Sequence, residues 1–229
     1  MKLVVKFGGT SLATVKDIRN VVKTIDEISK KNKIVVVCSA VDGITDELIQ
    51  ISSLIEKGNK KDANITLAKI SQKHKQFGTY LVTNSKILKS FLNKLNSDLS
   101  ELEELVHGLI LLGEVTPRSY DYLISFGERL SIDLVSFSLQ ELQNKSVPLS
   151  GKEAGIVTDS NFGDSRPLMD TTRIRLSKTI NAHLSKNTIP VIAGFAGADQ
   201  NENTTTFGRG GSDYTATIIA SCIDADEIW

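Results

Sequence analysis

Cysteine is scarce in this chain of 229 residues, which contains only Cys38 and Cys222. Both lie in apolar stretches, and neither has a companion at metal-ligand spacing. A disulfide framework and a structural zinc site are therefore excluded as the basis of the fold. We expect two buried thiols in a protein of a reducing compartment.

Net charge is also absent, because Lys plus Arg and Asp plus Glu number 27 each. A chain without a basic excess offers no electrostatic case for nucleic acid or for an anionic membrane surface as a partner. No apolar run approaches the roughly 20 residues that a membrane span needs. The apolar start ends at Gly8, so no signal peptide is visible. We expect a cytoplasmic protein.

The hydrophobic content of 40% is enough for one sizeable core. No shift of composition along the chain indicates two independent domains. We therefore expect a single globular unit.

Glycine is concentrated in the segment Thr204–Tyr214, which reads Thr-Thr-Thr-Phe-Gly-Arg-Gly-Gly-Ser-Asp-Tyr. Its glycines permit positive φ angles and a close approach of the backbone to a ligand. We expect Ser212 and Asp213 to cap a helix over Tyr214–Ile223, whose first N–H groups would favour an anion. Taken alone, the same string is equally typical of a flexible surface turn.

A second glycine loop follows the apolar run Lys2–Phe7, which predicts a buried strand with Lys6 near its end. After Gly8-Gly9-Thr10-Ser11, the spacing of apolar residues in Val15–Ile28 predicts an amphipathic helix. Strand, glycine turn and helix form the arrangement that cradles phosphate groups. The loop matches neither the P-loop pattern nor the full dinucleotide-binding pattern.

Further strands and helices are predicted in alternation. Strands are expected at Ile34–Cys38, Val147–Leu149 and Ile189–Ala193, and helices at Asp46–Ile55, Tyr120–Leu142 and Ile174–Leu184. Residues from about 62 to 113 predict a mostly helical insertion, as a helix pair. The turn-rich stretch Gly194–Thr206 also suits a hairpin tip, but we interpret it as a plain connection. Open parallel sheets bind ligands at the carboxyl ends of their strands, where both glycine loops are expected.

Four motifs in one order carry a family resemblance: Lys6-Phe-Gly-Gly-Thr-Ser11, Ser39-Ala-Val-Asp-Gly-Ile-Thr45, Ser125-Phe-Gly-Glu128 and the Thr204–Tyr214 string. The chain resembles aspartokinase, of the amino-acid kinase superfamily, from its first residue to its last. That resemblance implies an α/β fold, a three-layer sandwich with a mostly parallel central sheet covered by helices, incomplete at the C-terminus.

The resemblance covers the chain but not the whole family domain. Related kinases continue into a Thr-Asp-x-x-Gly loop that holds the nucleotide, a later lysine, and regulatory modules. The expectation is that residues 1–229 form the N-terminal, amino-acid-binding portion of the catalytic domain.

The implied reaction transfers the γ-phosphoryl group of ATP to the side-chain carboxylate of L-aspartate, giving 4-phospho-L-aspartate. This step opens lysine, threonine and methionine biosynthesis. ATP with Mg²⁺ is the implied co-substrate, with no tightly bound cofactor, no resident metal ligands and a homodimer as the expected assembly.

The resemblance also implies roles for individual residues. Lys6 would face the transferred phosphate, and Asp213 would orient Lys6 or the Mg²⁺ that accompanies ATP. Arg209 would bind the α-carboxylate of aspartate and Glu128 its ammonium, aided by the hydroxyls of Thr45 and Ser212. The expected phosphate-binding residues are Gly8, Gly9, Thr10, Ser11, Ser39, Gly210 and Gly211.

Two other interpretations stay open at this point. One is a kinase for a different small substrate, such as glutamate, N-acetylglutamate or a nucleoside monophosphate. The other is a non-catalytic amino-acid-binding fragment, which the missing nucleotide loop motivates.

Overall fold

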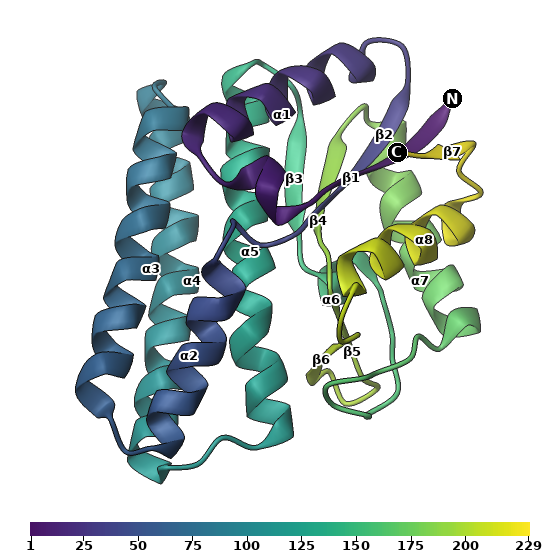
Figure 1. Cartoon of the computed structure of the whole chain (residues 1–229). Coiled ribbons are helices and arrows are strands. Elements are labelled where there is room, and N and C mark those ends of the chain that lie inside the picture. Colours follow the sequence, from purple (N-terminus) through teal and green to yellow (C-terminus); the bar gives the residue numbers. More distant parts are fainter.

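A five-stranded parallel sheet forms the centre of the computed structural model, which describes residues 1–229 (Figure 1). The strands are β1 (Lys2–Phe7), β2 (Lys33–Cys38), β3 (Ser146–Leu149), β4 (Ile189–Ala193) and β7 (Glu227–Ile228), in the order β3-β4-β2-β1-β7. Every neighbouring pair runs parallel. The predicted strands are thus confirmed, and the mostly parallel sheet with them.

Helices cover both faces of this sheet, which makes a three-layer sandwich (Figure 1). One face packs on α1 (Val15–Ser29) and α5 (Pro117–Glu141), the other on α7 (Met169–Ser185) and α8 (Gly211–Ile223). Alternate residues of a strand serve the two cores: Val36 points to the α1 and α5 side, and Val35 to the α7 and α8 side. A strand buried on both faces must be continuously apolar, as β2 is.

The predicted helical insertion is a helix pair, α3 (Lys60–Leu81) and α4 (Ser85–Leu112). Together with α2 (Ile44–Glu56) and α5 it builds a helical layer beside the sheet (Figure 1). His74 of α3 is fully buried, and burial lowers its pKa to about 4. His74 is therefore a packing residue of α3.

The connection after β4 is not plain. It forms an antiparallel hairpin of β5 (Ala196–Ala198) and β6 (Thr204–Thr206), so our interpretation of this stretch was wrong. Asp199 stabilises the tip by accepting hydrogen bonds from the backbone N–H groups of Asn201 and Asn203, both at 2.9 Å. Aspartate side chains commonly accept hydrogen bonds from nearby backbone N–H groups in turns of this kind.

Two short elements complete the chain, a 3₁₀ turn η1 (Gly9–Leu12) and α6 (Gly151–Ala154). Both cysteines are buried and free, as predicted. None of the helices combines the length and the apolar character that a bilayer crossing requires.

Candidate active site

A cavity of about 540 Å³ opens at the carboxyl ends of β1, β2 and β4, where a parallel sheet is expected to bind ligands. We call it the cleft. Its wall contains most of the residues that the sequence singled out: Lys6, Ser39, Thr45, Arg209, Gly210, Gly211, Ser212 and Asp213. Three segments that are far apart in the chain therefore meet at one edge of the sheet.

The charged pair Lys6 and Asp213 joins the two ends of the chain across the cleft. The Lys6 Nζ lies 2.6 Å from Asp213 Oδ1, with side-chain exposures of 23% and 70%. Parallel strand β1 places Lys6 at its C-terminal end, and the first turn of α8 places Asp213 opposite. The pair gives the cleft a fixed cation with an anion beside it.

The start of α8 differs from our expectation. The helix begins at Gly211, its N-cap is Gly210 with φ of 78°, and no side chain caps it. Ser212 and Asp213 lie inside the first turn, so the prediction that they form the cap was wrong. Gly210 turns the chain in the left-handed region, and the N–H groups of Gly211 and Asp213 are bonded within the turn, to Gly208 O at 3.1 Å and to Gly210 O at 3.0 Å.

Glu128 lies behind the loop that follows β2. The carboxylate is buried, Oε1 accepts the backbone N–H of Ala40 at 3.2 Å, and Oε2 has no hydrogen-bond partner. Burial raises its pKa to about 8. Glu128 does not line the cavity, but its bond to Ala40 places it against the loop that carries Ser39 and Thr45. An unsatisfied buried carboxyl gains from a ligand with a positive charge.

Gly127 explains how α5 approaches that loop so closely. A Cβ at this position would lie 2.9 Å from the Ala40 Cβ and 3.5 Å from the Thr45 Oγ1. A glycine inside a helix is about 1 kcal/mol less favourable than alanine, and this close approach is the reason for it here.

The first glycine loop contributes less to the cleft than expected. Gly8 follows Phe7 as the N-cap of η1, which contains Gly9, Thr10 and Ser11, and none of these four residues lines the cavity. Gly8 stays close to the site, since a Cβ there would contact the Lys6 Nζ at 3.6 Å. Their phosphate-binding role stays a prediction.

Two residues of this region were not predicted from the sequence. Phe195 lines the cleft with φ of 72°, an outlier for an aromatic residue, and Thr215 Oγ1 accepts its backbone N–H at 3.0 Å. Asp121, buried near the start of α5, accepts the N–H groups of Gly163 and Thr206 at 2.9 and 2.8 Å and the Thr206 hydroxyl at 2.8 Å. No local pattern in the sequence marks either one.

Comparison with known proteins agrees with this geometry, since the model of the amino acid kinase family matches residues 1–229. The chain belongs to the amino acid kinase family. The chain is 31% identical to an aspartokinase of Geobacillus stearothermophilus and 32% identical to the chloroplastic aspartokinase 3 of Arabidopsis thaliana. Each match covers 98% of this chain, and the chain spans 40% and 39% of the two relatives.

The fold of this chain is also found in solved structures of aspartokinases. Escherichia coli aspartokinase III in complex with lysine and aspartate superposes with a TM-score of 0.87 at 25% identity, over 99% of this chain and 48% of that chain. The same enzyme in complex with aspartate and ADP gives 0.86 at 24% identity, over 100% of this chain and 48% of that chain. The predicted fold class is confirmed.

Proposed function

We propose that this chain is the amino-acid-binding part of an aspartate kinase, which transfers the γ-phosphoryl group of ATP to the side-chain carboxylate of L-aspartate. The observation that carries the proposal is the Lys6–Asp213 pair, set in one cleft with Arg209, Ser39 and Thr45. The matching aspartokinases, and the aspartate and ADP bound to the E. coli enzyme, supply the substrate class.

The chemistry needs charge neutralisation more than proton transfer. An aspartate side chain, with an ordinary pKa of about 3.9, is ionised at neutral pH and attacks without a general base. The barrier arises from bringing this anion to the phosphate, so positioning and a fixed cation carry the catalysis. Lys6 is that cation in our proposal, and Asp213 holds its ammonium in place at 2.6 Å.

Substrate selection in the proposal uses two groups of opposite charge. Arg209 is exposed at the cleft and can bind the α-carboxylate with two parallel hydrogen bonds. Glu128 binds the α-ammonium, which would satisfy its unpartnered oxygen Oε2. Thr45 and Ser212 add hydroxyls that donate or accept.

Mg²⁺ fits this site as a companion of ATP. The ion commonly takes one or two protein carboxylates together with phosphate oxygens, and the largely exposed Asp213 carboxylate can supply one ligand. The ion would neutralise phosphate charge when bound. Backbone N–H groups of Gly8, Gly9, Gly210 and Gly211, with Thr10, Ser11 and Ser39, complete the phosphate-binding set that we propose.

Titration calorimetry of L-aspartate into this chain tests the substrate, with L-glutamate and N-acetyl-L-glutamate as controls. We expect saturable binding of L-aspartate alone. Binding of a control in its place would move the substrate assignment within the family, and no binding by a folded sample would reject an amino-acid site formed by these residues.

A non-catalytic amino-acid-binding role is the second candidate. It is motivated by the span of the chain, about 40% of its curated relatives. Because the proposal makes this chain only the amino-acid-binding part of the kinase, measuring ADP release by the full-length protein with ATP, Mg²⁺ and L-aspartate separates the two. Turnover supports the kinase, and tight aspartate binding without turnover supports the binding role.

We also propose a homodimer, on the resemblance alone. Sedimentation velocity over a range of concentrations tests it, and a monomer at all concentrations would reject a dimer formed by this chain.

A further inference from the structure

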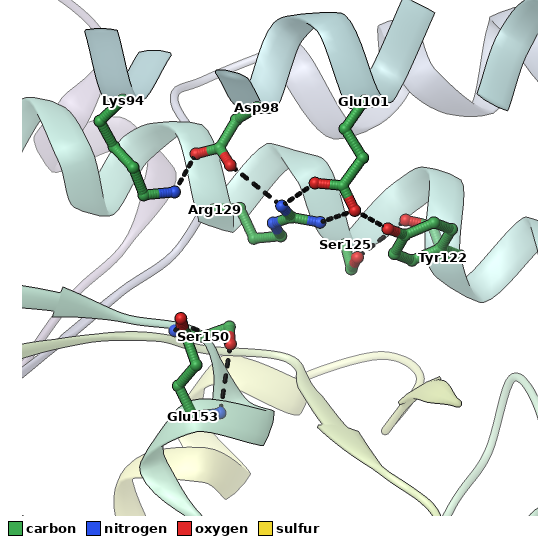
Figure 2. Close-up of polar contacts among 8 residues, drawn as sticks. All are labelled: Lys94, Asp98, Glu101, Tyr122, Ser125, Arg129, Ser150 and Glu153. Atoms are coloured by element: carbon green, nitrogen blue, oxygen red, sulfur yellow. Dashed lines mark hydrogen bonds and ion pairs between the residues drawn. The ribbon is translucent and has the colours of Figure 1, made fainter. Parts of the chain in front are cut away.

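A second cavity, of about 700 Å³, lies between helices α4 and α5 on one side and α6 with the β5–β6 hairpin on the other. It shares no lining residue with the cleft. Figure 2 shows its two walls, with the charged side chains of α4 and α5 facing the Ser150–Glu153 turn. Its volume lies within the range of small-molecule sites, about 300 to 1,000 Å³.

The α4 and α5 wall is an ordered network of charges (Figure 2). Asp98 accepts from Lys94 at 2.5 Å and from Arg129 at 3.0 Å. Arg129 also donates to Glu101 at 2.6 Å, and its guanidinium lies over the Phe126 ring at 4.3 Å. Two cations and two anions compensate one another in this network, and each of them is held by its neighbours.

Asp133 is the member of this wall without a donor. It lines the cavity, is fully buried, and neither of its carboxyl oxygens has a hydrogen-bond partner. Burial is the main cause that raises its pKa well above the ordinary value, and the neighbouring Asp98 adds to it. Lys94 and Arg129 act in the opposite direction and lower this pKa. In its protonated form Asp133 can donate to Asp98, and in its ionised form it is the third carboxylate beside two cations.

A single organic cation is the ligand that this arrangement would favour. A positively charged group entering beside Asp133 would offset the negative charge that this carboxylate, when ionised, adds to a network of two cations and two anions. No group of three or more His, Cys, Asp or Glu side chains is placed to hold a metal ion. The opposite wall is polar as well, with Lys152, Glu153 and Glu202 facing the same space.

We propose that this cavity is a second small-molecule site, which takes a ligand with a primary ammonium group on a polar body. Asp133 binds the ammonium as a carboxylate, and the neighbouring Asp98 adds negative charge. Lys94 and Arg129 hold Asp98 in position, and Glu101 holds Arg129. The site does not depend on the reaction in the cleft.

Amide NMR on ¹⁵N-labelled protein tests the proposal with 4-aminobutan-1-ol as the probe. Butane-1,4-diol is the matched control, since it has the same length and replaces the ammonium with a hydroxyl. We expect saturable shifts with the amine at Gly151 and Gly197, which line the cavity, and none at Gly210 and Gly211 of the cleft. The diol should shift none of them.

The variant Asp133→Asn separates a ligand site from a purely structural carboxyl. Asparagine has the shape of the neutral acid and can donate to Asp98, so we expect the variant to fold with a similar melting temperature. Its affinity for the amine should fall about tenfold or more, equal to a loss of about 1.4 kcal/mol. Asp159→Asn, in an exposed loop outside the cavity, is the control that should bind normally.

Three results would overturn the proposal: no saturable shift with the amine, equal shifts with the diol, or unchanged amine affinity in a folded Asp133→Asn protein. If Asp133→Asn unfolds, the diol comparison on the unsubstituted protein decides alone. Because the readout is binding and not turnover, failure here leaves the kinase proposal untouched.

Discussion

At the scale of single residues, Lys6 is the group on which the proposed chemistry depends. We expect Lys6→Ala in the full-length protein to lower the turnover number by about 10²-fold or more, because the fixed cation at the transferred phosphate is lost. The affinity for L-aspartate should change little. Turnover measured by ADP release, next to calorimetric binding, gives both quantities.

Lys30→Ala is the matched control, because Lys30 forms an exposed ion pair with Asp26 at 2.8 Å, on α1. Exposed pairs of this kind contribute about 0 to 1 kcal/mol to stability, so both variants should stay folded. Near-normal turnover in Lys6→Ala would remove Lys6 from the mechanism.

Arg209 is the second residue whose substitution is informative. We expect Arg209→Lys to weaken L-aspartate binding by about tenfold, because an ammonium cannot form two parallel hydrogen bonds to a carboxylate. Calorimetry measures the loss. Arg173→Lys, which changes an exposed arginine paired with Asp224 on α7 and α8, should bind normally. Unchanged affinity in Arg209→Lys would place the α-carboxylate elsewhere.

At the scale of elements, the contact between α5 and the loop after β2 depends on Gly127. Alanine in a helix is normally about 1 kcal/mol more favourable than glycine. At Gly127 the added Cβ would lie 2.9 Å from that of Ala40, so overpacking should outweigh this gain. We expect Gly127→Ala to destabilise the protein by about 1 to 3 kcal/mol in chemical denaturation.

Gly108→Ala is its control within α4, where a Cβ would have no neighbour within 4 Å. That variant should be stabilised, by up to about 1 kcal/mol. A gain of stability in both variants would show that α5 does not press on the loop.

Asp121 ties three elements together at the rim of the cleft, since its carboxylate joins α5 to Gly163 and to Thr206 at the end of β6. Asp121→Ala leaves two backbone N–H groups without an acceptor, at about 1 to 3 kcal/mol for each one that stays buried. We expect a lower melting temperature and weaker L-aspartate binding. Asp121→Asn, which keeps an oxygen for the two N–H groups, should restore most of both.

The control for this substitution is Asp159→Ala, which removes an exposed aspartate that also accepts two backbone N–H groups. It should leave L-aspartate binding intact. If Asp121→Ala bound L-aspartate normally in spite of a lower melting temperature, the residue would be structural only.

At the scale of the whole molecule, Glu128 should make both binding and stability depend on pH. Its folded pKa of about 8 lies above the ordinary value of 4.5. Between those values the folded protein holds a proton that the unfolded chain has released, so the stability contributed by Glu128 falls as pH rises. Chemical denaturation at several pH values should show this slope reduced in Glu128→Gln.

Ligand binding should follow the opposite trend. An α-ammonium needs Glu128 ionised, so L-aspartate should bind more tightly as pH approaches 8 and should release close to one proton at pH 7. Calorimetry in buffers of different ionisation enthalpy measures the release. Equal heats in all buffers would contradict the role of Glu128, and Glu104→Gln, an exposed change on α4, should behave as the unsubstituted protein.

The sequence by itself determined the elements and their kind. Continuous apolar runs predicted β1, β2 and β4, and the spacing of apolar residues predicted α1, the α3–α4 pair and α5, because burial imposes these periods locally. The sequence also identified the glycine loops and Arg209 as candidate binding residues, since loops of this composition follow parallel strands at their carboxyl ends.

Only the tertiary structure decided which side chains meet. The three hydrogen bonds of Asp121 and the approach of Gly127 to Ala40 join positions far apart in the chain, and no local pattern encodes such contacts. The pairing of Lys6 with Asp213 was expected from the family resemblance, not from any local pattern. Packing also decided three other features: the β5–β6 hairpin, the positive φ of Phe195 and the Asp133 carboxyl without a hydrogen-bond partner. The energies of these groups depend on burial and on neighbours that only packing brings together.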